Sequence, residues 1–491
     1  MSQKPADTLN DLIVPLVRQA RYAEALDGFD QVLRLDPRHT FAWNNRGICL
    51  EATGRLEESL QSLDKAVSLD AEFADAWANR AKTLARLGHV DDALVDCDRA
   101  LALNPEHGGA LMNKAMLLLL QGRLEEGFQL YGNRWRVMRH KIRPRQGRLW
   151  MGGEPLAGKT LLIHPEQGMG DCLQFCRYAL VAAQQGARVI LEVPQPLVRL
   201  MQGLHADIVV VAQGDPVPAH DLHCPLLSLP RAFHTSLLDI PAAPYLRADA
   251  RRAAAWRRRL GQGRGGRHTL KVGLVWSGGH RPDQPEIWDV NERRNIPLMR
   301  LAPLNLPGIR FISLQKGQEP EGQLHHLRAM GWSGPQIEDY SAELNDFADT
   351  AALVDCLDLV ISVDTSTAHL AAGMGKPTWV LNRHDTCWRW MIGRDDSPWY
   401  PSLRLFRQAA PGDWTPVVAR VRAELSRLVA AGRSERLEKS TGSARGSAMV
   451  NMAHDLQTFP MNPGSGDGLP PGAAAAAGTE PNRQGLAARI L

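Results

Sequence analysis

The residues best suited to chemistry lie in one stretch, 359–377, with the sequence LVISVDTSTAHLAAGMGKP. An apolar, β-branched run at 359–363 predicts a buried strand. Small polar residues at 364–367 separate it from a helical pattern that ends near Gly375. Hydroxyl side chains, unpaired backbone N–H groups and the positive end of a helix dipole together suit a phosphate. The same residues would also serve an ordinary strand, cap and helix, because capping uses the same side chains.

A second candidate is Asp171, at the end of the segment PEQGMGD between a predicted strand, 160–164, and a predicted helix, 172–185. Gly168 and Gly170 allow the backbone of this turn to approach a ligand closely. In open parallel sheets, ligands lie beyond the carboxyl ends of the strands, which is where this turn falls. An aspartate before a helix is also common as a helix cap, so a structural role stays open.

These two stretches carry a family resemblance. The segment SVDTSTAHLAAGMGKPTWVL resembles the D-T-x-x-x-H-L-A motif of the bacterial heptosyltransferase-like enzymes of glycosyltransferase family 9, which cradles the diphosphate of a nucleotide sugar. The matching positions are Asp364, Thr365, Ser366, Thr367 and His369. The turn EQGMGD resembles the G-D element that follows the first strand in the same family. That resemblance implies Asp171 as the general base that removes the proton of an acceptor hydroxyl.

The resemblance also implies that the second half of the chain holds the nucleotide. The implied nucleotide-sugar contacts, with Gly168 and Gly170 of the first half, are Ser277, Gly278, Arg293, Arg294, Gln315 and Lys316. The basic members of this set would neutralise the diphosphate and stabilise it as a leaving group. Each of them could equally be a surface residue. Trp388 and Trp390, in a segment rich in Trp and Arg, either stack on a base or a sugar or pack in the core.

The elements that must position these residues alternate between strand and helix from about residue 156, which indicates mostly parallel sheets. We expect two Rossmann-like halves, 156–260 on the acceptor side and 270–430 on the nucleotide-sugar side, in the arrangement called GT-B in glycosyltransferases. A basic linker at 142–155 precedes them. Residues 433–491 are rich in Ser, Gly, Pro and Ala and are expected to form a disordered tail.

Residues 6–141 repeat about every 34 residues, which is typical of the tetratricopeptide repeat (TPR). Positions in register include Asp36, Asp70 and Asn104; Trp43, Trp77 and Leu111; and Gly54, Gly88 and Gly122. We expect an α-helical solenoid of about three clear helix pairs after one weaker copy, with the glycine closing the first helix of each pair. The fold class is therefore α followed by α/β.

A TPR solenoid presents a concave groove that binds extended peptides. Asn45, Asn79 and Asn113 are in register on the first helices of the repeats and could hydrogen-bond a peptide backbone. They could equally be solvated helix positions. The repeat part is expected to do no chemistry of its own.

The composition bounds the class of protein. The 491 residues are enough for about two to four domains, and 44% hydrophobic with 22% charged residues is globular. The net charge of +4 is modest for this length and by itself argues neither for nor against a nucleic-acid partner. The Arg-rich join lacks interleaved stacking aromatics, so no nucleic-acid partner is expected. Seven scattered cysteines fit a reducing compartment.

With neither a signal peptide nor an apolar run of about 18 residues, we expect a cytoplasmic protein that does not span a membrane. The basic residues of 134–148 form a solvated face, or they contact an acidic lipid surface or substrate phosphates.

These patterns together predict a glycosyltransferase, hexosyl- or heptosyltransferase-like, that moves a sugar from a nucleotide sugar to a hydroxyl acceptor. The TPR repeats would recruit a protein partner or the acceptor, and neither a cofactor nor a metal is expected. The alternative is a binding scaffold, in which the repeats are attached to a transferase fold that has lost catalysis. Retention of Asp171 together with Asp364 and Thr365 favours the enzyme.

Overall fold

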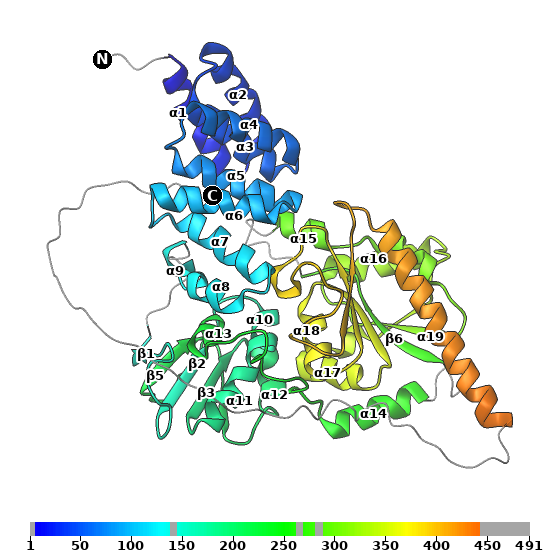
Figure 1. Cartoon of the computed structure of the whole chain (residues 1–491). Helices are drawn as coiled ribbons and strands as arrows, with labels where there is room; N and C mark the ends of the chain where they lie inside the picture. Colours follow the sequence, from blue (N-terminus) through cyan, green and yellow to red (C-terminus); the bar gives the residue numbers. More distant parts are fainter. Residues whose placement is uncertain (1–4, 138–144, 262–268, 280–287, 442–491) are drawn as a thin grey trace, which may run out of the picture. The chain divides into compact units, whose positions relative to one another are not determined.

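The computed structural model describes residues 5–137, 145–261, 269–279 and 288–441 (Figure 1). An N-terminal helical part is followed by two parallel β-sheets with their helices, so the α plus α/β class is confirmed. The contacts discussed below lie within one compact unit, Met1–Val429. Most of the expected tail lies outside the described residues, but the last helix, α19 (Thr415–Thr441), continues past residue 433, where the tail was expected to begin.

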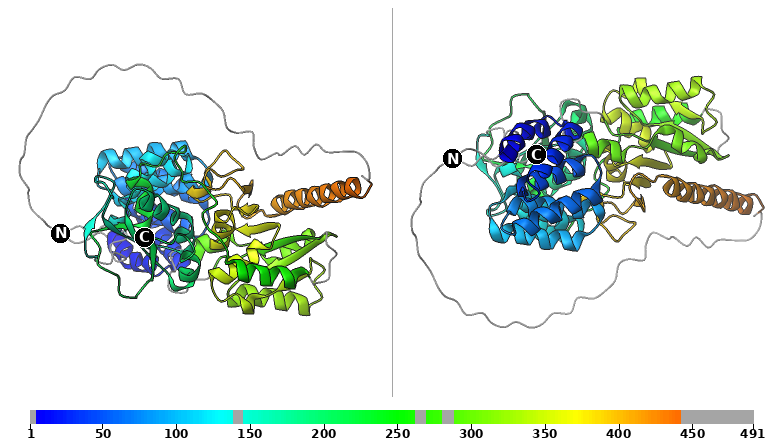
Figure 2. Two further views of the ribbon diagram at one scale, coloured as in Figure 1. Left: turned by 90° about the horizontal axis from the view of Figure 1, so that it is seen from below. Right: turned by 90° about the horizontal axis from the view of Figure 1, so that it is seen from above.

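The helical part is built from adjacent helix pairs, which lie side by side in Figures 1 and 2. Its helices are α1 (Pro5–Arg18), α2 (Tyr22–Leu35), α3 (Thr40–Ala52), α4 (Leu56–Leu69), α5 (Ala74–Leu87), α6 (Val90–Leu103), α7 (Gly108–Leu120), α8 (Leu124–Tyr131) and α9 (Arg134–Val137). The first helices of the three clear pairs are followed, within two residues, by Gly54, Gly88 and Gly122. Their φ angles of 78°, 87° and 82° favour glycine, as the repeat pattern predicts.

Small residues let the paired helices approach closely. A Cβ on Gly47 would lie 2.6 Å from Cγ of Leu63 on the partner helix. Ala81 and Ala115, at the equivalent positions of the next two repeats, are fully buried. The predicted TPR packing is confirmed at these positions.

The first sheet has five strands in the order β1-β5-β2-β3-β4, and all of its neighbours are parallel. The strands are β1 (Arg148–Leu149), β2 (Thr160–His164), β3 (Arg188–Val193), β4 (Ile208–Ala212) and β5 (Leu222–Pro225). The helical segments between and after these strands are α10 (Met169–Phe175), α11 (Arg177–Gln184), η2 (Gln195–Leu197), α12 (Val198–Met201), η3 (Leu226–Ser228) and α13 (Leu229–Ala232). The strand order changes direction between β2 and β5, which makes this a topological switch point.

The second sheet has six parallel strands in the order β11-β10-β9-β6-β7-β8. Its strands are β6 (Leu270–Val275), β7 (Ile309–Ser313), β8 (Ile337–Asp339), β9 (Leu359–Val363), β10 (Thr378–Asn382) and β11 (Leu403–Arg407). Its helical segments, with the connecting α14, are α14 (Ala250–Gly261), α15 (Trp288–Arg294), η5 (Leu298–Leu304), α16 (Gln318–Ala329), η6 (Ser341–Glu343), α17 (Phe347–Asp355), α18 (Ser366–Gly373) and η7 (Trp388–Trp390). The switch point lies between β6 and β9, in the doubly wound order that binds ligands at that crevice.

Three boundaries differ from the sequence expectation. The predicted linker, 142–155, contributes β1, which pairs with β5. The single helix predicted for 172–185 is two, since α10 already begins at Met169 and Cys176 separates it from α11. Helix α14, expected at the end of the first half, packs against α17 of the second. The first and third differences depend on contacts between distant segments, which local periodicity does not encode.

Candidate functional site

The two sequence motifs meet in space. The turn after β2 begins α10, the turn after β9 begins α18, and these two helices pack against each other (Figure 1). A Cβ on Gly170 would lie 3.1 Å from Cδ2 of His369 and 3.6 Å from Cα of Ser366. Glycine at this position therefore allows the close approach. The switch points of both sheets consequently contribute to one candidate site.

Asp171 binds within this site through both carboxylate oxygens. Its Oδ2 accepts a hydrogen bond of 2.8 Å from the backbone N–H of Gly168, which is the N-cap residue of α10. Its Oδ1 pairs with Nη2 of Arg389 from η7. The predicted capping role is thus present, although Asp171 occupies the third helical position rather than the cap itself.

The sequence patterns did not identify Arg389, which lies between Trp388 and Trp390. Its Nε donates to Oε1 of Gln174 at 2.8 Å, and its guanidinium lies 4.3 Å from the ring centroid of Trp388. The Asp171 and Arg389 side chains are only 15% and 11% exposed. The two sheets are therefore joined at the candidate site by a largely desolvated ion pair. The available signal was one arginine within the aromatic segment WRW.

His369 is a neutral, ordered side chain at the start of α18. Its Nδ1 lies 2.9 Å from the hydroxyl of Tyr400, and its ring stacks on Trp390 at 5.1 Å and 15°. Burial lowers the pKa of His369 to about 4, although the nearby Asp364 opposes this shift. The imidazole therefore orders the site without adding positive charge at neutral pH.

The lowered pKa of His369 predicts a pH-dependent loss of stability. Because the folded value lies below the usual value of about 6.5, the unfolded chain binds more protons between these two pH values. Acidification from pH 7 to pH 4.5 should therefore cost about 2–3 kcal/mol at this residue. His369→Gln should lose correspondingly less stability over that range, as measured by urea unfolding at both pH values. Equal losses in the two proteins would contradict this assignment.

The hydroxyl residues of the motif surround the first turn of α18. Thr365 is its N-cap, with extended backbone and no side-chain capping bond to the helix. The Thr365 hydroxyl instead lies 2.9 Å from the Ser362 hydroxyl. Thr365 and Thr367 are buried, whereas Asp364 and Ser366 are half-buried. The helix therefore begins without a capping side chain on its first N–H groups, as an anion site requires.

The side-chain amide of Gln315 holds the loop that follows β6 through hydrogen bonds to its backbone. Its Oε1 accepts hydrogen bonds of 3.0 Å from the N–H groups of both Trp276 and Ser277, and its Nε2 donates to the Ser277 carbonyl at 2.9 Å. The Arg294 guanidinium packs against Gly278, where an added Cβ would lie 2.2 Å from Nη2. The structure thus gathers Ser277, Gly278, Arg294 and Gln315 around one turn, with Gln315 holding its shape.

Two other predicted phosphate ligands have protein partners. Arg293 pairs with Asp289 and, at 2.9 Å, with Asp385. Lys316 donates to the Ser341 carbonyl at 2.8 Å. Arg293 also lines a hollow of about 590 Å³ together with Arg86 of α5. The side chains of Arg293 and Lys316 thus both bind protein groups in this structure.

Two of the in-register asparagines, Asn79 and Asn113, connect neighbouring repeats. Nδ2 of Asn79 donates to Oδ1 of Asn44 at 2.9 Å, and Nδ2 of Asn113 donates to the Ala78 carbonyl at 2.9 Å. The Oδ1 of Asn45 lies 3.4 Å from Nδ2 of Asn44. Asn45, Asn79 and Asn113 are half-buried. These side chains therefore have a structural role in α3, α5 and α7, and this role does not exclude binding of a peptide.

The last repeat supports the turn that carries Asp171. Arg134 forms two hydrogen bonds, of 2.8 and 2.7 Å, with the carboxylate of Glu166, and both side chains are buried. Burial raises the pKa of Glu166 despite Arg134 beside it. The Tyr131 hydroxyl accepts from Nε2 of Gln167 at 3.1 Å. Phe128 packs edge-to-face on Trp388, with ring centroids 5.5 Å apart.

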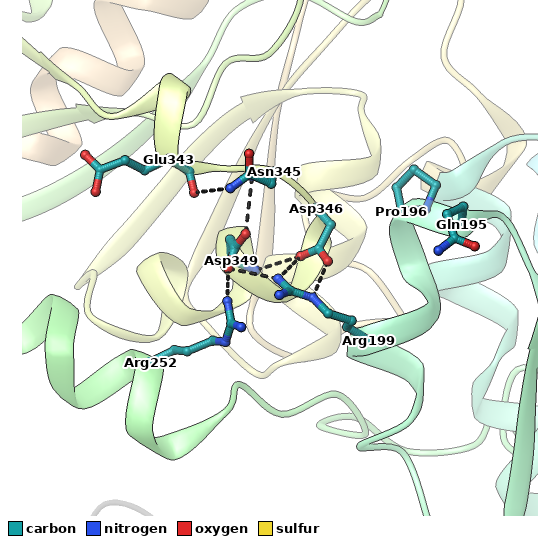
Figure 3. A pocket seen from close by; sticks show the side chains of 8 residues that line it. All are labelled: Gln195, Pro196, Arg199, Arg252, Glu343, Asn345, Asp346 and Asp349. Atoms are coloured by element: carbon teal, nitrogen blue, oxygen red, sulfur yellow. Dashed lines mark hydrogen bonds and ion pairs between the residues drawn. The ribbon is translucent and has the colours of Figure 1, made fainter.

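A separate hollow of about 610 Å³ contains none of the predicted site residues. Figure 3 shows Arg199 of α12 reaching Asp346 and Asp349, and Arg252 of α14 reaching Asp349. The Asp346 carboxylate also caps α17 by accepting from the N–H groups of Ala348 and Asp349. This cluster is an ionic contact between elements of the two halves.

The described ranges show neither a metal-binding cluster nor a membrane-spanning helix. No group of three or more His, Cys, Asp or Glu side chains there is arranged to hold a metal ion. None of the helices in those ranges is both long and apolar enough to cross a bilayer.

Comparison with known families identifies the repeats. Residues 15–77 and 74–107 each match a tetratricopeptide repeat family, so the predicted TPR repeats are confirmed. Protein FlbA of Caulobacter vibrioides is 28% identical over 339 residues, a match that covers 62% of this chain and 52% of FlbA. The chain thus spans about half the length of this curated relative.

Several solved structures each align with about a quarter of this chain. The first TPR of RPAP3, solved with an HSP90 peptide, is 20% identical with a TM-score of 0.23, covering 24% of this chain and 93% of that one. MamA is 19% identical with a TM-score of 0.25, covering 27% and 73%. A tetratricopeptide repeat protein from Parabacteroides merdae is 22% identical with a TM-score of 0.25, covering 28% and 56%.

Proposed function

We propose that this protein is a glycosyltransferase of the GT-B type that transfers a sugar from a nucleotide sugar to a hydroxyl acceptor. The observation that carries the proposal is the contact of α10 with α18, which places Gly170 against His369 and Ser366. Two motifs that resemble the base and diphosphate elements of one enzyme family therefore share a site. Hexosyl and heptosyl donors both remain within the proposal.

In the proposed reaction, the acceptor hydroxyl oxygen attacks the anomeric carbon of the donor. The bond from that carbon to the diphosphate oxygen breaks, and its electron pair leaves with the nucleoside diphosphate. The Asp171 carboxylate takes the hydroxyl proton. The first turn of α18 stabilises the negative charge of the leaving diphosphate through its N–H groups and helix dipole.

The TPR repeats are proposed to hold a protein partner or the polypeptide that carries the acceptor hydroxyl. Repeat solenoids use a concave surface for such binding. RPAP3, whose first TPR has a similar fold, binds an HSP90 peptide. The buried contacts of Arg134 and Tyr131 with the Asp171 turn would connect such a partner physically to the site.

A catalytically inactive scaffold is the second candidate, and one observation favours it. Both oxygens of Asp171 accept hydrogen bonds from protein groups, which is unfavourable for a general base. An inactive scaffold would bind its protein partner but release no nucleoside diphosphate from any nucleotide sugar. Measuring that release separates the two candidates.

Adding negative charge at the start of α18 should weaken nucleotide binding by about 5- to 150-fold. Ser366→Asp suits a helix N-terminus, so stability should be retained, but a carboxylate there repels a diphosphate by about 1–3 kcal/mol. Ser366→Asn has nearly the same size without the charge and is the matched control. Calorimetric titration with ADP, GDP, UDP, CDP and dTDP should show one selective ligand for the wild type and Ser366→Asn. Equal affinity in Ser366→Asp, or binding of none of these nucleotides by the wild type, would contradict the proposed function.

A further inference from the structure

Arg389 is the cation of the candidate site that is best suited to bind a phosphate. Within the described residues, its one carboxylate partner is Asp171. Its remaining contacts are neutral: Oε1 of Gln174 at 2.8 Å, Sγ of Cys387 at 3.3 Å and the face of Trp388. A guanidinium with a single, monoanionic partner in a desolvated site can exchange that partner for a more highly charged anion.

The position of Arg389 places it where the two halves meet. Its partner Asp171 follows Gly170 directly, and Gly170 contacts His369 and Ser366 of the α18 turn. The charges of Asp364, Arg389 and Asp171 all act on the His369 imidazole, so the Arg389 and Asp171 pair lies within electrostatic range of the α18 turn. By contrast, Arg293 is already paired with two carboxylates, those of Asp289 and Asp385.

We propose that Arg389 binds the diphosphate of the donor and that Asp171 and this diphosphate compete for its guanidinium. Diphosphate binding would draw Arg389 away from Asp171. The freed carboxylate oxygen could then accept the proton of the acceptor hydroxyl. This inference rests on the proposed function and reconciles it with the fully hydrogen-bonded Asp171. It makes the base available only after the donor has bound.

The competition predicts that removing the charge of Asp171 strengthens nucleotide binding. In Asp171→Asn the side chain at position 171 is neutral and cannot form an ion pair with Arg389. The nucleoside diphosphate that binds the wild type should therefore bind this variant about tenfold more tightly. Arg389→Lys keeps the charge but loses the planar fork, and should bind the same nucleotide more weakly than the wild type. Arg389→Gln combined with Asp171→Asn removes both charges and should bind at least about tenfold more weakly than Asp171→Asn alone.

A matched control is available in the repeats. Asp96 is buried and forms two hydrogen bonds of 2.7 Å with Arg80. Asp96→Asn makes the same chemical change in a buried arginine pair away from the site, and should leave nucleotide affinity unchanged.

Isothermal titration calorimetry of the full chain with the five nucleoside diphosphates named above distinguishes the outcomes. Tighter binding in Asp171→Asn, with unchanged affinity in Asp96→Asn, is the expected result. Nucleotide binding by the wild type that does not tighten in Asp171→Asn overturns the competition but leaves the proposed function standing. Binding of none of the five by the wild type or Asp171→Asn overturns both.

Discussion

Asp171→Asn is expected to slow sugar transfer by about 10²–10⁴-fold, the usual contribution of a general base. The amide can still accept from the Gly168 N–H group, so α10 keeps its first turn while the proton acceptor is lost. Because the same change is expected to strengthen donor binding, the loss should appear in kcat rather than in KM. The measurement is the release of nucleoside diphosphate from the donor under saturating conditions.

The control for this prediction is Asp96→Asn, which should keep the wild-type rate because Asp96 lies in the repeats. A rate for Asp171→Asn within a few-fold of the wild type would rule out Asp171 as the base. If the variant had both a lower rate and a lower melting temperature than the wild type, Asp171 would instead have a structural role, through its bonds to Gly168 and Arg389.

Arg134→Met is expected to destabilise the protein by about 3–5 kcal/mol, because it leaves the buried Glu166 carboxylate without its partner. The pair joins the last repeat to the turn that holds Asp171, and Arg134 also donates to the Ser228 hydroxyl at 2.7 Å. Urea unfolding measured for the wild type and the variant gives the difference in free energy.

Two comparisons keep this prediction specific. Arg123→Ala removes an exposed arginine pair with Glu126 on α8 and should cost no more than about 1 kcal/mol. Arg134→Met combined with Glu166→Leu removes both buried charges and should recover much of the lost stability. If the single and double variants were equally unstable, the ion pair would not be the cause.

The sequence was sufficient where a local pattern has one structural meaning. The recurring Gly54, Gly88 and Gly122 marked the ends of the first helices of three successive repeats, and the structure shows all three with positive φ. The apolar runs before Asp171 and Asp364 marked two central strands, and the polar residues after them marked the turns. Each of these patterns spans less than about one repeat or one strand and helix.

The sequence was insufficient where a role depends on a partner from elsewhere in the fold. Gln315 resembled a ligand in a strand-end loop, but its amide binds the backbone of Trp276 and Ser277. Arg389 gave little local signal beyond its place in the segment WRW, because its importance comes from Asp171, which lies 218 residues earlier in the chain. Similarly, β1 lies in a segment that composition alone marks as a basic linker, and it becomes a strand by pairing with β5.

The contacts of the repeats with the Asp171 turn bear on how a partner could affect catalysis. Tyr131 and Arg134 contact Gln167 and Glu166, the two residues that precede Gly168. The repeats are therefore continuous with the wall of the candidate site. Removing them would expose the buried Glu166 and Trp388, so activity measurements belong on the full chain.

The most direct test of the central claim is a crystal structure of the wild type with its tightest-binding nucleoside diphosphate. We expect the diphosphate at the first turn of α18, within hydrogen-bonding distance of the N–H groups of Ser366 and Thr367, with the Arg389 guanidinium turned toward it from Asp171. A nucleotide bound instead in the hollow beside Arg199 and Asp346, with the Arg389 and Asp171 pair intact, would contradict it.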